Sequence, residues 1–128
     1  MWRIGLILAG GLYLATAVYM WAAPQSWYEI TPGVAMMGPF NLHFIRDIAL
    51  VFLLSACALA WGGFKNDKTA AVLGAAWPCL HAAYHIAIWL GRGVPIDTVA
   101  VTNLLGIQVP AWFAMACALK MTAMRAGK

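Results

Sequence analysis

Histidine, arginine and aspartate side chains stand in two short stretches of an otherwise apolar chain. His43, Arg46 and Asp47 lie in the first stretch, and His81 and His85 lie in the second. His43 and Asp47 are four residues apart, as are His81 and His85, so on a helix each pair shares one face. If these two faces meet, imidazole, guanidinium and carboxylate groups line one polar site. Asp47 would then take a proton from a ring nitrogen of His85 or pair with Arg46.

The histidine spacing is compatible with metal or haem binding. Two imidazoles four residues apart hold one metal ion when a facing helix supplies a third ligand, here His43 or Asp47. Haem would instead take His43 or His81 opposite His85 as its two axial ligands, with Arg46 near a propionate. Copper also fits, because two methionines, which are soft ligands, precede His43 in the chain.

The same residues have two further interpretations. Asp47 and a histidine would serve as an acid–base pair on a lipid-like or quinone substrate. Alternatively, Arg46 and Asp47 extend to the lipid headgroups or form a structural ion pair, and the histidines pack through hydrogen bonds. The sequence contains no paired cysteine spacing and no glycine-rich phosphate loop.

The composition places most of these residues in lipid. Apolar residues make up 64% of the 128 residues and charged residues only 9%, and the mean hydropathy is +0.80. A soluble domain of this size carries about a quarter charged residues. The composition therefore excludes a soluble enzyme, a disordered chain and a nucleic-acid-binding protein, although the net charge is +4.

Four apolar stretches, each of about 20 residues, predict four membrane-spanning helices. They cover residues 3–23, 41–64, 69–91 and 99–119. We expect one all-α domain over residues 1–128, an integral membrane four-helix bundle whose short connections make neighbouring helices antiparallel. The first stretch is longer than the core of a secretory signal and is followed by Pro24, so we expect it to be a retained span.

The basic residues predict the orientation of the chain. Six of them fall at the two ends of the chain or in the middle loop: Arg3, Lys65, Lys68, Lys120, Arg125 and Lys128. The loops on the other side carry only Arg92. Because basic residues concentrate on the cytoplasmic side, both termini are expected there.

Polar side chains from all four spans fall at shared depths in the outer half of the membrane. Counted from the middle of each span, Tyr19, Arg46, Asp47, His85 and Asn103 lie about 7–10 Å to the outer side of the centre. His81 lies close to the centre, with Tyr84 between the two histidines in the sequence. The predicted ligand-binding residues are therefore Tyr19, His43, Arg46, Asp47, His81, Tyr84, His85 and Asn103.

One segment resembles a known group of proteins. Residues 32–47 read PGVAMMGPFNLHFIRD. Together with the four short spans, this segment resembles the DoxX-like membrane proteins and uncharacterised bacterial four-helix relatives with a similar Asn-x-His-Phe-x-Arg-Asp stretch. The resemblance implies a bacterial inner-membrane four-helix bundle associated with redox or respiratory partners. It implies no catalytic residue.

These observations lead to one main expectation and two alternatives. We expect an accessory subunit or small-ligand-binding protein of a membrane assembly, whose partners are the lipid bilayer and other membrane subunits or further copies of the chain. The first alternative is a haem- or copper-binding redox protein that uses His43, His81 and His85. The second is a membrane enzyme that acts on a lipid-like or quinone substrate.

Overall fold

All the regular structure of the described part of the chain, residues 1–121 of a computed structural model, is helical. Four helical stretches are long and apolar enough to cross a membrane. The elements are α1 (Trp2–Ala22), α2 (Pro24–Ile30), η1 (Ala35–Met37), α3 (Leu42–Lys65), α4 (Lys68–Gly91), α5 (Thr98–Asn103), η2 (Leu104–Gln108) and α6 (Val109–Leu119). The predictions of an all-α fold and of four long apolar helical stretches are thus confirmed, with each boundary within one residue of its expected position.

Polar side chains fix where the long helices begin and end. Asn41 caps α3, because its side-chain oxygen accepts a hydrogen bond from the backbone N–H of Phe44 at 3.0 Å. Asp67 caps α4 in the same way, and Asp97 caps α5. Asn66 ends α3 in the left-handed conformation, with φ at 57°. The connection between α3 and α4 is therefore only two residues long.

Small residues allow the long helices to approach closely. A Cβ atom added at Gly62 would lie 2.8 Å from the backbone nitrogen of Ala71, and one at Gly74 would lie 2.9 Å from that of Leu59. A Cβ at Gly10 of α1 would lie 3.0 Å from the carbonyl oxygen of Ala56 on α3. These contacts join α1 to α3 and α3 to α4, and α6 packs against both α4 and α1.

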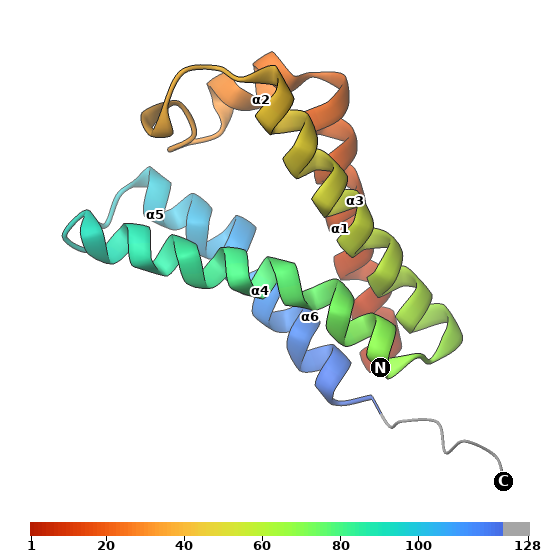
Figure 1. The fold of residues 1–128 in the computed structure, drawn as a ribbon. Coiled ribbons are helices and arrows are strands. Elements are labelled where there is room, and N and C mark those ends of the chain that lie inside the picture. The colour runs from red at the N-terminus through yellow and green to blue at the C-terminus, as the bar shows by residue number, and fades with distance from the viewer. Residues whose placement is uncertain (122–128) are drawn as a thin grey trace, which may run out of the picture.

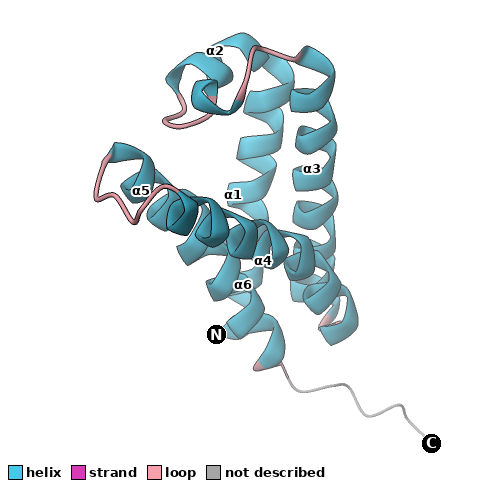
Figure 2. Ribbon diagram, turned by 60° about the vertical axis from the view of Figure 1, so that its left-hand side comes forward, coloured by secondary structure: helices cyan, strands magenta, loops and turns pink. Residues whose placement is uncertain are grey.

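The four spans share a core at one end and separate into two arms at the other (Figure 1, Figure 2). The shared core contains residues of all four spans, among them Leu6, Leu59, Ala71 and Cys117. Beyond it, α1 and α3 keep a small core of their own around Met20. The other arm, α4 with α5, η2 and α6, keeps a second one, which consists of Cys79, Ala82 and Ala111.

The connection from α1 to α3 folds over the ends of the arms. Its short helix α2 is anchored by a hydrogen bond between the Tyr19 and Ser26 hydroxyl groups, and the Tyr28 hydroxyl donates to the carbonyl of Gly38. Gly33, with φ at 92°, lies so close to Val99 that a Cβ there would be 2.7 Å from its Cγ1 atom. The loop of the first arm therefore touches the beginning of α5.

The last span is one continuous helical stretch with a π-helical turn in it. The backbone N–H of Val109 bonds to the carbonyl of Leu104, five residues earlier. Pro110 follows directly, and its ring provides no N–H for the carbonyl of Gly106. A wider turn accommodates such a proline, and we attribute η2 to it.

The glycine contact between α1 and α3 gives a direct test of this packing. Replacing Gly10 with leucine should destabilise the protein by about 1–3 kcal/mol, because the new side chain meets the α3 backbone. Gly11→Leu is the matched control, since a side chain at Gly11 meets nothing within 4 Å. Thermal unfolding in detergent measures both variants. Equal midpoints for the two would contradict the close approach of α1 and α3.

Candidate functional site

Three rings form a column along one face of α4. Trp77, His81 and His85 are spaced four residues apart, so they lie above one another on the helix. The Trp77 and His81 rings are stacked, with centroids 4.9 Å apart and planes 12° apart. The His81 and His85 rings meet edge to face with centroids 4.5 Å apart. The prediction that the two histidines share a face is confirmed.

Rings from the first arm continue the column. Phe52 of α3 lies edge to face with Trp77 at 5.0 Å and with His81 at 6.4 Å. Tyr13 of α1 packs against Phe52 at 5.6 Å. The column therefore begins in the shared core and runs along α4 to where the arms have separated. We call Tyr13, Phe52, Trp77, His81 and His85 the ring column.

The two imidazoles are partly exposed and have no hydrogen-bond partner among residues 1–121. A neutral imidazole carries one N–H donor and one nitrogen acceptor. Two such rings in a membrane-spanning helix therefore offer unused donors and acceptors at a depth where lipid provides no partner. These groups are available to a ligand.

A small cavity lies against the ring column at His81. It has a volume of about 10 Å³, and its lining includes Tyr13, His81 and Gly106. The Tyr13 hydroxyl is buried and has no hydrogen-bond partner in the described part of the chain. Tyr13 itself is 3% exposed. A buried hydroxyl without a partner is costly, so this side chain is a second unsatisfied polar group next to His81.

The polar side chains of the last span have a structural role. Gln108 donates to the carbonyl of Ala82 at 2.8 Å and also bonds to the side chains of Asn103 and Trp112. Asn103 donates to the backbone carbonyl of His85 at 3.5 Å. These bonds attach α5 and η2 to α4. Asn103, predicted to bind a ligand, therefore contacts the backbone carbonyl of His85.

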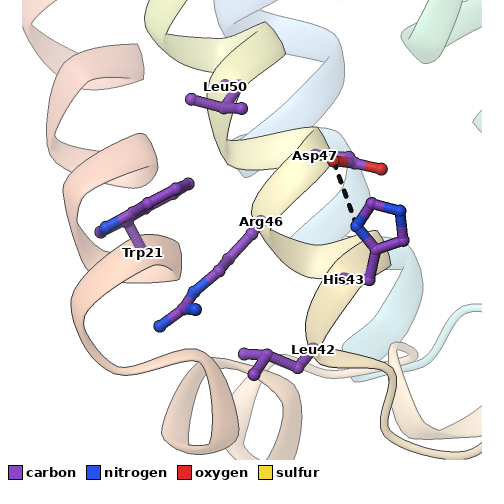
Figure 3. A pocket seen from close by; sticks show the side chains of 6 residues that line it. All are labelled: Trp21, Leu42, His43, Arg46, Asp47 and Leu50. Carbon is purple, nitrogen blue, oxygen red and sulfur yellow. Dashed lines mark ion pairs between the residues drawn. The ribbon is translucent and has the colours of Figure 1, made fainter.

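His43, Arg46 and Asp47 lie apart from the ring column. His43 Nδ1 is 3.5 Å from Asp47 Oδ1, and their side chains are 88% and 55% exposed. Arg46 extends along the ring of Trp21 instead (Figure 3). The two faces that the sequence analysis considered together do not meet, because α3 turns Ile45 and Ala49 toward α1 and presents His43 and Asp47 to the surface.

This arrangement differs in three ways from the arrangements that the sequence analysis considered. Asp47 pairs with His43 rather than with His85 or Arg46. No three His, Cys, Asp or Glu side chains come together as metal ligands within residues 1–121, so His43 does not complete a metal site with His81 and His85. The rings of His81 and His85 lie edge to face one turn apart on a single helix, so they do not face each other across a space in which a haem would lie.

The two predicted tyrosines also have separate positions. Tyr19 bonds to Ser26 of α2 and so helps to hold the connecting loop. Tyr84 is exposed and lies edge to face with His85 at 6.3 Å. The sequence analysis missed Phe52 and Trp77 as partners of the histidines. Trp77 could have been identified from its position four residues before His81, which places the two side chains on the same face of a helix.

An ion pair closes the turn between α4 and α5. Arg92 and Asp97 are joined at 2.6 Å. The backbone N–H of Ala100 and, after it, the Arg92 side chain hold the pKa of Asp97 below its usual range. The carboxylate therefore stabilises the beginning of α5, which carries the polar contacts to α4.

No protein-family model, curated protein or solved structure matches this chain. The resemblance to DoxX-like proteins therefore stays a prediction from the motif around His43.

The lowered pKa of Asp97 predicts that the protein loses stability at acidic pH. The stabilising contribution of the Asp97 carboxylate is complete above about pH 4, the usual pKa of an aspartate in an unfolded chain. This contribution disappears as the pH falls through the lower pKa of Asp97 in the folded state. Asp97→Asn should remove this part of the pH dependence. Circular dichroism of the detergent-solubilised protein between neutral and acidic pH measures it. Identical acid profiles for wild type and variant would show that the pair contributes nothing.

Proposed function

We propose that this chain is a small-ligand-binding protein of the bacterial inner membrane whose ligand belongs to the quinone class: lipid-soluble molecules with a flat ring and hydrogen-bonding oxygens. The observation that carries the proposal is the pair of partly exposed imidazoles, His81 and His85, in a membrane-spanning helix. Polar groups at that depth are costly unless they are paired. A ligand oxygen would accept a hydrogen bond from an imidazole N–H and so pair it.

The surroundings of the histidines favour a flat ring over other lipid-soluble molecules. Trp77 already stacks face to face on His81, so the column is built for ring-on-ring contact. Phe52 supplies a further apolar edge. A ligand with an apolar ring and oxygens at its rim matches both the stacking surface and the free imidazole nitrogens. A saturated acyl chain would match neither.

We infer that neighbouring helices run antiparallel and that both termini lie in the cytoplasm. Two basic side chains support this topology. Arg3 Nε donates to the carbonyl of Gly63 at 2.7 Å, and Lys68 Nζ donates to that of Leu119 at 3.0 Å. The beginnings of α1 and α4 and the ends of α3 and α6 therefore share one basic end, which the positive-inside rule assigns to the cytoplasm. Arg125 and Lys128, which entered the same prediction, lie outside the described residues.

We also propose that the chain acts as an accessory subunit of a membrane assembly. The second arm supports this role, because α5 and η2 bury none of their residues. Their large apolar side chains are exposed instead: Val101, Leu104 and Leu105. Such a surface suits a helix of another subunit or of a second copy.

The ligand proposal is tested by binding of a short-chain ubiquinone to the protein in nanodiscs, measured by calorimetry. Replacing His81 or His85 with alanine should each weaken binding by about tenfold, because each removes a hydrogen-bond donor to the ligand. His43→Ala is the matched control, since that exposed imidazole lies outside the ring column.

Two results would contradict the ligand proposal. One is no detectable binding by the wild-type protein. The other is an equal effect of all three histidine substitutions, which would mean that the ring column has no special role. Circular dichroism of each variant confirms that the helices remain intact.

The accessory role makes a separate prediction about size. In mildly solubilised native membranes the chain should migrate in a complex well above its own mass of 13.8 kDa. Leu105→Lys should release it, because a charge on the α5–η2 surface cannot be buried against a partner helix. Leu54→Lys, at an equally exposed position on α3, should leave the complex intact. Monomeric migration of the wild type would contradict an accessory role.

A further inference from the structure

The small cavity beside His81 lies at the junction between the shared core and the second arm. All four spans contribute to its lining, which consists of Tyr13, Phe52, Pro78, His81, Gly106 and Ile107. Tyr13 belongs to the shared core, and Ile107 packs against the core of the second arm. The cavity therefore brings Tyr13, from the buried interior, and His81, from α4, to the same space.

Two irregular places in the helices account for this space. Pro78 lies inside α4, and the π-helical turn η2 contains both Gly106 and Ile107. A proline ring and a widened turn each disturb the packing of a regular helix. Gly106 adds no side chain, and a Cβ atom there would meet nothing within 4 Å. Space for a small molecule therefore remains here, although the helices pack closely elsewhere.

The size of the cavity limits its occupant to a single water molecule. Its volume is about 10 Å³, which is about the least that a buried water needs. Pockets for small organic ligands are far larger, roughly 300–1,000 Å³. The ring of a lipid-soluble ligand therefore cannot enter this cavity and has to bind outside it, along the ring column.

The polar groups at the cavity match the needs of a buried water, which makes about two to four hydrogen bonds. The Tyr13 hydroxyl is buried and has no hydrogen-bond partner among residues 1–121. The imidazole of His81 has none in that part of the chain either. Because both residues line a space of one water, a water in it is within reach of both.

We propose that one water molecule bridges the Tyr13 hydroxyl and a ring nitrogen of His81. The hydroxyl donates to the water, and the water donates to the ring nitrogen that carries no hydrogen. If the imidazole donated to the water instead, either the tyrosine hydrogen or both water hydrogens would have no acceptor among these groups. A buried tyrosine hydroxyl normally has a partner, and the bridge provides one.

The bridge fixes the tautomer of His81. A neutral imidazole carries hydrogen on one nitrogen only, so the nitrogen that accepts from the water leaves the hydrogen on the other. This second nitrogen is a donor for an acceptor outside the cavity. Tyr13 is thus a positioning residue that acts through His81. The use of this donor by a quinone oxygen rests on the proposed function, whereas the water bridge does not.

Nitrogen NMR of the protein with isotope-labelled histidine tests the bridge without any ligand. At mildly alkaline pH, where histidine is neutral, the two ring nitrogens of His81 should have well-separated shifts, as expected for one tautomer. Tyr13→Phe removes only the hydroxyl and should move these shifts toward each other, because the tautomers then exchange. Tyr84→Phe is the matched control. This exposed tyrosine contacts His85, so its substitution should leave the His81 shifts unchanged.

Magnetisation transfer from water in the same samples detects the water itself. Transfer should reach the ring of Tyr13, although this residue is only 3% exposed. Leu59, which is fully buried in the same core, is the dry reference and should receive none. Equal lack of transfer to both residues would overturn water as the occupant.

Thermal unfolding in detergent separates a bridged hydroxyl from an unpaired one. Tyr13→Phe should lower the unfolding midpoint by about 3–6 °C, because it breaks the bridge. An unpaired hydroxyl would give the opposite sign, since its removal would relieve a desolvation cost. Tyr84→Phe, at the surface, should change the midpoint little.

Three further results would overturn the proposal. They are a mixture of His81 tautomers in the wild type, an identical His81 spectrum in Tyr13→Phe, and a raised unfolding midpoint in that variant. Failure of the proposed function is distinguishable. A protein that binds no ubiquinone but whose His81 spectrum responds to Tyr13→Phe would lose the proposed ligand and keep the water bridge. Ubiquinone binding with an unresponsive spectrum would do the reverse.

Discussion

The close approach of helix backbones at glycine is the contact on which the rest of the structure depends. In a bilayer, helices gain little from burying apolar side chains, so they associate where small residues let their surfaces touch. Gly10, Gly62 and Gly74 provide such positions between α1, α3 and α4. The contact at Gly62 lies beside the two-residue connection from α3 to α4. The spans are therefore held together most tightly at one end, and the other end is free to separate into two arms.

This separation explains the unusual setting of the histidines. In a bundle packed closely along its whole length, a face of α4 that carries two imidazoles would be covered by a neighbouring helix and would need partners there. Here the neighbouring rings reach only as far as Phe52 of α3, which contacts both Trp77 and His81. Within residues 1–121, the aromatic contacts of His85, one turn further along, are all to residues of its own helix. The imidazoles are thus placed by stacking, and their nitrogens stay available.

The polar side chains of the spans form two groups, which differ in the contacts that hold them in place. Arg3, Asn103 and Gln108 donate to backbone carbonyls of other helices and so join the spans. His81 and Arg46 are positioned by aromatic rings instead, through stacking and a cation–π contact. Contacts with rings hold a side chain in place without using its hydrogen-bonding atoms. This is the physical basis for the ligand that we propose at the ring column.

The sequence by itself determined the four apolar helical stretches and their boundaries, because length and hydropathy are local properties of the chain. It also determined that His81 shares a face with His85, and His43 with Asp47, since helical spacing fixes this. Only the tertiary structure decided which neighbour each face meets. Ile45 and Ala49 pack with Met20 in the core between α1 and α3, so His43 lies on the exposed surface of α3. Helical spacing determines which residues share a face. How the packed helices are rotated against each other determines which neighbour that face contacts.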